Sequence, residues 1–338
     1  MTKKLSILIP QYNEDTATVC RLLDSIKIQQ RINLDEIEVL IQNDGNDETI
    51  IPDEILKAYP FDIQYYIGDH IGVSATRNEL LRNAKGEYVA FCDADDAYNG
   101  LFALFVVFRE MAIGFDALIG NFIQETKLPN GEFIMMDMPM NFNFVHGKFW
   151  RRKFLIDNEI ECREDSPIHE DAPLMSLTRA YTQNIKYAQI PLYAWLWRDS
   201  SVCRKDELYI QKTMKHLLMN QSWVIEKLLK RGRNDIVREI AWSIINDVFY
   251  SLNEKKWLDT ANKELRDTAE GYFKFFYNTY KKYADELTQA QKDQIVAAQK
   301  QMSIQKGVLH ENTTFSQWIE HIEKNVEPIE FELKSSNK

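Results

Sequence analysis

No apolar stretch in this sequence of 338 residues is long enough to cross a membrane. The longest, 101–108, ends at Arg109, whereas a membrane-spanning helix needs about 20 apolar residues. The stretch near the start, 5–10, is too short and too β-branched for a secretory signal, and no small-residue cleavage site follows it. We therefore expect a cytoplasmic protein without a transmembrane segment, either in solution or peripheral at the inner face of the membrane.

Closely spaced cysteines are also missing. The four cysteines are Cys20, Cys92, Cys162 and Cys203, and no two of them form a CxxC pair. The sequence therefore predicts neither a zinc site nor a disulfide framework. We expect these side chains to serve as small buried hydrophobic groups.

An excess of basic residues is absent from both parts of the chain. Residues 1–205 contain 21 Lys and Arg against 31 Asp and Glu, and residues 206–338 contain 20 of each, so the net charge of −10 belongs to the first part. Nucleic-acid binding is disfavoured because it requires a basic surface. A site that gathers a divalent cation fits the acidic first part better.

The hydrophobic pattern divides the chain into two regions. Strand patterns at 5–10, 37–42, 62–67 and 88–92 alternate with helix patterns at 16–29, 52–58 and 73–84. This alternation predicts a parallel sheet whose ligands bind beyond the carboxyl ends of the strands. From about residue 206 the spacing is helical, and we expect an α/β domain over 1–205 and an α-helical domain over 206–338. Aromatic residues expected in the core of the helical domain are Tyr272, Phe273, Phe276, Tyr277 and Tyr280.

The strongest chemical signal is the acidic segment Asp93-Ala94-Asp95-Asp96 at the end of a predicted strand. Three carboxylates in four residues repel one another unless a cation or solvent separates them. Mg²⁺ and Mn²⁺ prefer such oxygen ligands, and two carboxylates leave coordination positions for diphosphate oxygens. The alternative is an acidic turn exposed to solvent.

Four blocks in chain order carry a resemblance to a known family. They are SILIPQYNE at 6–14, QNDGNDET at 42–49, GVSATRN at 72–78 and GEYVAFCDADD at 86–96. In residue types, order and spacing they resemble the GT-A glycosyltransferases of family 2. The resemblance continues at 146–152 and at 169–174, where these enzymes carry an acceptor-side Glu-Asp motif, and it covers about residues 4–205. It implies a Rossmann-like GT-A domain with a mostly parallel central sheet.

The resemblance also implies a pocket for a nucleotide sugar. Pro10, Tyr12 and Glu14 would line its nucleotide end. Asp44 would accept the imide N–H of uracil, a contact that excludes cytosine because cytosine N3 has no proton. Arg77 would lie beside the base and the diphosphate, where a fixed positive fork suits anionic oxygens.

Further along the implied pocket, Asp93 would hold the ribose and the sugar, and Asp93 and Asp95 would bind Mn²⁺ or Mg²⁺. Two readings of Asp96 stay open, since it would either bind the sugar or cap the segment that follows. Arg198 and Ser201 would lie close to the diphosphate.

On the acceptor side, Asp171 matches the catalytic base of the family and Glu170 would shape the acceptor pocket. A carboxylate within reach of a sugar hydroxyl can take its proton during attack. The alternative for Asp171 is a helix N-cap, a position that Asp often occupies.

These features together imply a metal-dependent inverting transferase. It would move a sugar from a UDP-sugar to a hydroxyl of a glycan, a teichoic-acid-like polyol phosphate or another cell-surface acceptor. The helical domain would bind the acceptor or form a homo-oligomer, and the methionine-rich stretch 135–140 would be either an adaptable acceptor lid or core packing. Two alternatives remain, a nucleotidyltransferase that releases pyrophosphate and a non-catalytic sugar-binding or assembly protein.

Overall fold

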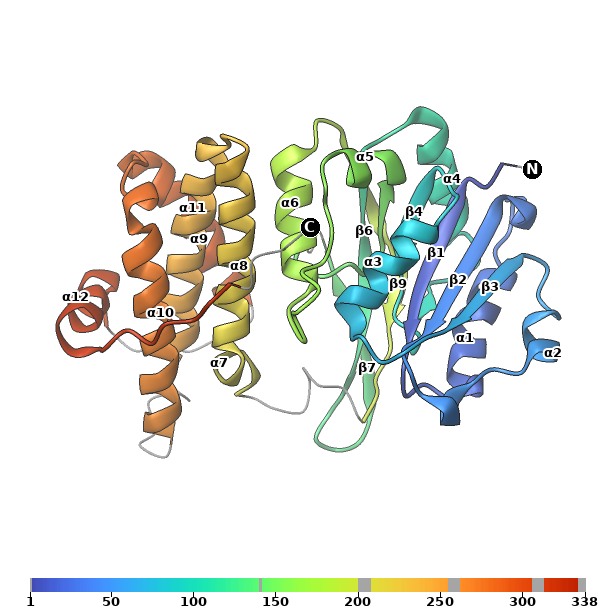
Figure 1. Ribbon diagram of the computed structural model, residues 1–338, viewed down its shortest axis with the longest axis horizontal. Helices are drawn as coiled ribbons and strands as arrows, with labels where there is room; N and C mark the ends of the chain where they lie inside the picture. The colour runs from blue at the N-terminus through green and yellow to red at the C-terminus, as the bar shows by residue number, and fades with distance from the viewer. Residues whose placement is uncertain (1, 140–141, 200–207, 255–261, 306–312, 334–338) are drawn as a thin grey trace. The chain divides into compact units, whose positions relative to one another are not determined.

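The computed structural model describes residues 2–139, 142–199, 208–254, 262–305 and 313–333 (Figure 1). The chain divides into two compact units, Met1–Ser201 and Val202–Lys338. The first unit combines strands and helices, whereas the described part of the second consists mainly of helices.

The first unit is built on one nine-stranded sheet. Its strands are β1 (Leu5–Gln11), β2 (Ile37–Asn43), β3 (Asp62–Ile67), β4 (Tyr88–Phe91), β5 (Ala97–Tyr98), β6 (Ala117–Lys127), β7 (Phe133–Met138), β8 (Lys148–Arg151) and β9 (Ile185–Trp195). Their order is β3-β2-β1-β4-β8-β6-β9-β5, with β7 paired to β6. β1 to β4 run parallel as the sequence predicts, whereas β8 runs antiparallel to both β4 and β6. The sheet is therefore mixed, with a parallel part that contains the predicted strands.

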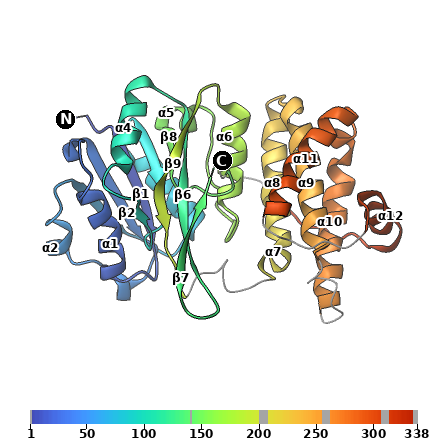
Figure 2. The same ribbon diagram turned by 180° about the vertical axis from the view of Figure 1, so that it is seen from behind.

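Helices cover both faces of this sheet. They are α1 (Thr16–Lys27), α2 (Asp53–Leu56), α3 (Val73–Asn83), α4 (Ala103–Ile113), α5 (Arg152–Asp157) and α6 (Asp171–Tyr181), with short 3₁₀ turns at Leu34–Glu36 and Asp47–Thr49. Figures 1 and 2 show α3 and α6 on one face and α1 and α4 on the other. In β1, Ile7 is buried in one cluster with Val19 of α1, and the next residue, Leu8, points to the opposite face and is also buried. Burial on both faces explains why β1 is a continuous apolar run.

The methionine-rich stretch lies in β7, at the edge of the sheet. Met135 and Met136 are exposed, so the core-packing interpretation is wrong for these two residues, whereas Met138 is half-buried and packs against the core. Met140 lies outside the described residues. Cys92 and Cys162 are buried as expected, whereas Cys20 is half-buried and Cys203 is also outside the described residues.

The second unit contains α7 (Tyr209–Lys212), α8 (Met214–Lys230), α9 (Asn234–Leu252), α10 (Lys263–Ala284), α11 (Gln289–Gln305) and α12 (Phe315–Asn325). Of the aromatic residues expected in its core, Phe273, Phe276 and Tyr280 are buried and the other two are half-buried. Within the described ranges, no helix has both the length and the apolar character that crossing a bilayer requires.

Candidate active site

The polar segments that follow β1, β2 and β4 lie at one edge of the sheet. In the parallel register Gln11 is opposite Asn43, and β4 ends at Phe91 opposite Leu8. The N–H of Asp44 donates to the carbonyl of Gln11 at 2.8 Å and so ties the first two segments together. This edge is the carboxyl end of the parallel strands, where ligands bind in open α/β sheets.

At this edge Tyr12, Asp44 and His70 form what we call the Tyr12–Asp44–His70 cluster. The buried Asp44 carboxylate accepts the backbone N–H of Ile71 at 2.7 Å and that of Gly72 at 3.0 Å, just before α3 begins. The Nδ1 atom of His70 lies 2.9 Å from Asp44 Oδ2. The His70 ring stacks on Tyr12, with ring centroids 4.5 Å apart. His70 could not be predicted as a site residue, because a histidine in a polar loop has no distinctive sequence pattern.

Gly45 permits the loop that carries His70 to approach the turn after β2. Its φ is +79°, and a Cβ atom there would lie 2.5 Å from the backbone nitrogen of His70. We expect Gly45→Ala to lower the free energy of unfolding by more than the roughly 1 to 3 kcal/mol that backbone strain alone costs. Gly131→Ala is the matched control, since Gly131 has a φ of +86° and no atom within 4 Å of its Cβ position. Chemical denaturation of both variants measures the difference, and equal losses would contradict the close-approach argument.

Arg77 of α3 connects three carboxylates in the interior. It is only 2% exposed. Its Nη1 donates to Glu170 Oε1 at 2.9 Å and to Asp171 Oδ1 at 2.7 Å, and its Nη2 donates to Asp93 Oδ1 at 2.8 Å. Burial lowers the pKa of Arg77, but the three carboxylate charges outweigh this effect and hold the pKa well above its ordinary value. The guanidinium therefore joins the segment after β4 to the start of α6.

The start of α6 shows how Asp171 is held. The helix begins at Asp171, and the N-cap is Glu170, whose side chain makes no capping hydrogen bond. The Asp171 carboxylate instead accepts the Arg77 guanidinium on Oδ1 and the N–H of Val145 on Oδ2, at 3.0 Å. The helix-cap interpretation of Asp171 is therefore wrong, because its side chain is directed toward α3 and the segment before β8. Burial raises the pKa of the neighbouring Glu170 carboxyl.

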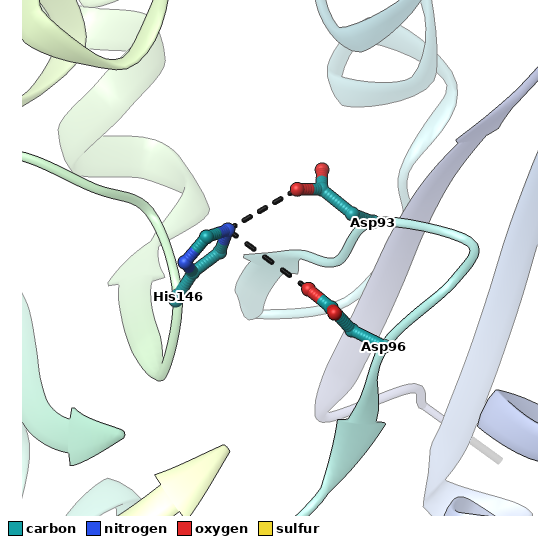
Figure 3. A group of neighbouring side chains, drawn as sticks. All are labelled: Asp93, Asp96 and His146. Carbon is teal, nitrogen blue, oxygen red and sulfur yellow. Dashed lines mark hydrogen bonds and ion pairs between the residues drawn. The ribbon is translucent and has the colours of Figure 1, made fainter. Parts of the chain in front are cut away.

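His146 binds the other oxygen of Asp93. Figure 3 shows its Nε2 directed at Asp93 Oδ2, 3.1 Å away, and at Asp96 Oδ2, 4.0 Å away. The buried imidazole is stacked between Phe144 and Tyr193, with centroid distances of 5.5 and 5.3 Å and nearly parallel planes. Asp93 thus receives Arg77 on one oxygen and His146 on the other, and these two partners lower its pKa although partial desolvation acts to raise it. His146 lies in one of the segments that resemble the family, but its sequence position alone predicts no role for it.

Asp96 is completely buried and bonded to β9. Its carboxylate accepts the hydroxyl of Tyr193 at 2.8 Å and the N–H of Leu196 at 2.9 Å. Burial, followed by the charges of Asp93 and Asp95, raises the pKa of Asp96 well above its ordinary value. This placement suits an internal anchor between the acidic segment and β9 better than a sugar contact.

Asp95 points to a different group of residues, at the end of β1. Arg198 donates to Glu14 Oε1, and its Nη1 lies 3.4 Å from Asp95 Oδ2. Burial, Asp93 and Glu14 together raise the pKa of Asp95. Glu14 also accepts the N–H of Tyr12 at 2.9 Å. Four residues predicted for the sugar-donor pocket are therefore adjacent: Tyr12, Glu14, Asp95 and Arg198.

Pro10 and Ser201 are also predicted to belong to the sugar-donor pocket. Pro10 lies near the end of β1, opposite Gln42. Ser201 lies outside the described residues.

The fit of a divalent cation depends on which carboxylates are accessible. Asp93, Asp96 and His146 offer ligand atoms within 4.8 Å of one another, and Asp95, which the sequence predicts as a ligand, is not in this group. Asp96 is 0% exposed, however, whereas the side chains of Asp93 and Asp95 are 31% and 24% exposed. The accessible carboxylate oxygens suit a hard cation such as Mn²⁺ or Mg²⁺. Of the acidic segment, Asp93 and Asp95 thus keep carboxylates that a cation can reach, whereas Asp96 does not.

The first unit is similar to known glycosyltransferases. Residues 6–159 match the family described as "Glycosyl transferase family 2". Among curated relatives, "Glycosyltransferase GlyA" of Streptococcus pneumoniae is 36% identical over 96 residues, which are 28% of this chain and 13% of the relative. "Minor teichoic acid biosynthesis protein GgaB" of Bacillus subtilis is 34% identical over 93 residues, which are 27% of this chain and 10% of the relative. The match therefore spans only a small part of these longer proteins.

A solved structure extends the likeness beyond this segment. TarS residues 1–349 of S. aureus, in complex with UDP-GlcNAc, superpose with a TM-score of 0.58 and 18% identity over 81% of each chain. At this identity the likeness concerns the fold. The GT-A fold expected from the sequence, followed by a helical region, is confirmed.

Proposed function

We propose that this chain transfers a sugar from a UDP-sugar to a hydroxyl of a glycan or polyol-phosphate acceptor. The premise is that the chain belongs to glycosyl transferase family 2, whose family model matches residues 6–159. The single observation that carries the proposal is the Arg77 guanidinium, which binds Asp93 and Asp171 at once. Asp93 is the carboxylate assigned to the sugar donor, and Asp171 is the one assigned to the acceptor. Their common partner holds both sides of a transfer reaction in one fixed arrangement.

In this proposal Asp171 accepts the proton of the attacking hydroxyl. Its two oxygens each accept one internal hydrogen bond, from Arg77 and from the N–H of Val145. A carboxylate oxygen has two lone pairs, so each oxygen keeps one for the acceptor hydroxyl. The two internal bonds fix the orientation of the carboxylate, which favours proton transfer in a defined geometry.

The names of similar proteins support the substrate classes proposed here. TarS binds UDP-GlcNAc in its solved complex, and GgaB is named for teichoic acid biosynthesis. For this chain we assign the UDP end of the sugar donor to Tyr12 and Asp44, and a polyol-phosphate or glycan chain to the acceptor side at Glu170 and Asp171. The helical unit as an acceptor-binding or oligomerising module stays a prediction, as does a location in the cytoplasm or at the inner face of the membrane.

A cation bound by Asp93 and Asp95 would neutralise the charge that develops on the leaving diphosphate. His146 and Arg77 keep Asp93 in place by binding its two oxygens. Arg198, which lies between Glu14 and Asp95, supplies a further positive charge beside the same position.

We expect Asp95→Asn to raise the Mn²⁺ or Mg²⁺ concentration for half-maximal turnover by at least about tenfold, since loss of even a supporting residue costs that much at metal sites. The measurement is UDP release from a UDP-sugar, with EDTA abolishing it and added metal restoring it. Asp53→Asn is the control, because Asp53 is an exposed aspartate that pairs with Lys57. An unchanged metal requirement in Asp95→Asn would remove Asp95 from the metal site, and release of pyrophosphate instead of UDP would favour a nucleotidyltransferase.

A further inference from the structure

We infer that the His70 side chain competes with the nucleobase for one slot, formed by the ring of Tyr12 and the carboxylate of Asp44, and so tunes how tightly the base binds. The inference rests on the proposed function, because the ligand it concerns is the uracil of a UDP-sugar. In this slot the imidazole makes the two contacts that a flat base with a ring N–H would make. His70 therefore lowers the apparent affinity for a base that enters the slot.

The first contact is the stack on Tyr12. The two rings have centroids 4.5 Å apart and planes inclined by 25°. This spacing lies at the short end of the range for stacked aromatic pairs, so a third ring cannot lie between them. A base that stacks on this face of Tyr12 must take the place of the imidazole.

The second contact is a hydrogen bond to Asp44, and its direction follows from the partners. Nδ1 of His70 lies 2.9 Å from the Oδ2 atom and 3.0 Å from the backbone oxygen of Asp44. A carboxylate oxygen and a carbonyl oxygen only accept, so Nδ1 must carry the hydrogen. The imidazole thus presents a ring N–H to Asp44, as the imide edge of uracil would. Cytosine has no proton at N3 and lacks this feature.

The surroundings allow the imidazole to leave while the slot keeps its shape. Asp44 also accepts the N–H groups of Ile71 and Gly72, and these bonds do not involve the His70 side chain. Gly45 permits the close approach of the His70 backbone. The His70 side chain is 57% exposed and the Asp44 side chain 4%. Displacement therefore requires only that one half-exposed side chain turns into solvent, while the carboxylate stays positioned.

Competition for the slot makes a quantitative prediction. The apparent affinity for the base equals the intrinsic affinity multiplied by the fraction of molecules in which the slot is accessible. If His70 occupies it most of the time, His70→Ala should bind UDP about three- to tenfold more tightly than the unchanged protein. Asp69→Ala is the matched control, because Asp69 is the exposed neighbour in the same loop and should leave the affinity unchanged.

The test is calorimetric titration of the full chain with UDP, CDP and GDP in the presence of Mn²⁺. Tighter UDP binding by His70→Ala, with CDP remaining weak, supports the inference. Unchanged or weaker UDP binding by His70→Ala overturns the inference and leaves the proposed function intact. Equal affinities of the unchanged protein for UDP and CDP overturn the role of the ring N–H. Absence of UDP binding by both the unchanged protein and the variant overturns the proposed function as well.

A second measurement avoids dependence on the variant. In the unchanged protein, the imidazole carbon-bound protons of His70 lie against the Tyr12 ring, and UDP should shift their NMR signals toward those of a solvent-exposed histidine. Signals that stay in place at saturating UDP contradict the competition.

Discussion

Replacing Asp171 by asparagine is expected to lower turnover by about 10²- to 10⁴-fold, because an amide cannot accept the proton of the acceptor hydroxyl. This loss corresponds to roughly 3 to 5 kcal/mol of activation free energy. UDP binding should persist, since the proposed function assigns Asp171 to the acceptor and not to the sugar donor. Initial rates of UDP release, together with calorimetric UDP binding, measure the two effects separately.

The structure changes the expected effect of this substitution on stability. From helix capping alone, the sequence predicts little cost, because Asn caps a helix about as well as Asp. Asp171 instead accepts from Arg77 on one oxygen and from the Val145 N–H on the other. Asparagine has one oxygen, so its NH₂ group must face one of these two donors, at a cost of about 1 to 3 kcal/mol.

Thr178→Val is the matched control for that cost. Thr178 lies on the same helix, and its buried hydroxyl accepts the indole N–H of Trp150 at 3.0 Å. Valine leaves this indole N–H unpaired, so the stability loss should be similar while turnover per folded molecule stays near the native value.

Near-native turnover in Asp171→Asn would place the base elsewhere. Loss of UDP binding would assign Asp171 to the sugar-donor side.

Replacing Arg77 by methionine is expected to destabilise the fold by about 3 to 5 kcal/mol, or to prevent folding, because carboxylates would lose their buried cation. Arg77→Lys should fall between this variant and the native protein. It keeps the charge, but a single ammonium cannot reproduce the fork that reaches Asp93 and the start of α6 together. Turnover should fall in both variants, since the two sides of the site lose their common partner.

Urea denaturation gives the free energies of unfolding for this comparison. Arg82→Met is the control on the same helix. Arg82 is exposed, and its Nη1 atom lies 3.5 Å from Oε1 of the exposed Glu164. Pairs of this kind contribute about 0 to 1 kcal/mol. If Arg77→Met costs no more than Arg82→Met, the interior network around Arg77 does not stabilise the fold.

The parallel part of the sheet could be predicted because each of its strands has a local pattern. The apolar run 5–10 became β1, and the predicted strand 62–67 became β3 with the same bounds. β8 could not be predicted, since its four residues include Lys148 and Arg151 and its partners are distant in the sequence. Lys148 is buried in spite of its charge, with its ammonium donating to the carbonyl of His146 at 2.7 Å. Only tertiary pairing makes this segment a strand.

In the candidate site, too, sequence motifs identified some of the residues but not the groups that hold them in place. Family blocks singled out Arg77, Asp93 and Asp171, and the structure brings these three together, although their roles in catalysis stay predictions. The groups that hold them were not predictable. One is the backbone N–H of Val145, which has no side-chain signature, and another is His146, whose position depends on stacking between residues from different segments.

Asp44 has a consequence for how such a protein could change its nucleotide during evolution. The carboxylate assigned to the base also accepts the two backbone N–H groups at the entrance to α3. A mutation of Asp44 that changes the base preference therefore also removes the hydrogen-bond acceptor of these backbone N–H groups. Leaving a buried donor unpaired costs about 1 to 3 kcal/mol of stability. The identity of the base is thereby protected by the fold itself. A lineage that exchanged uracil for another base would first need a compensating substitution near Ile71.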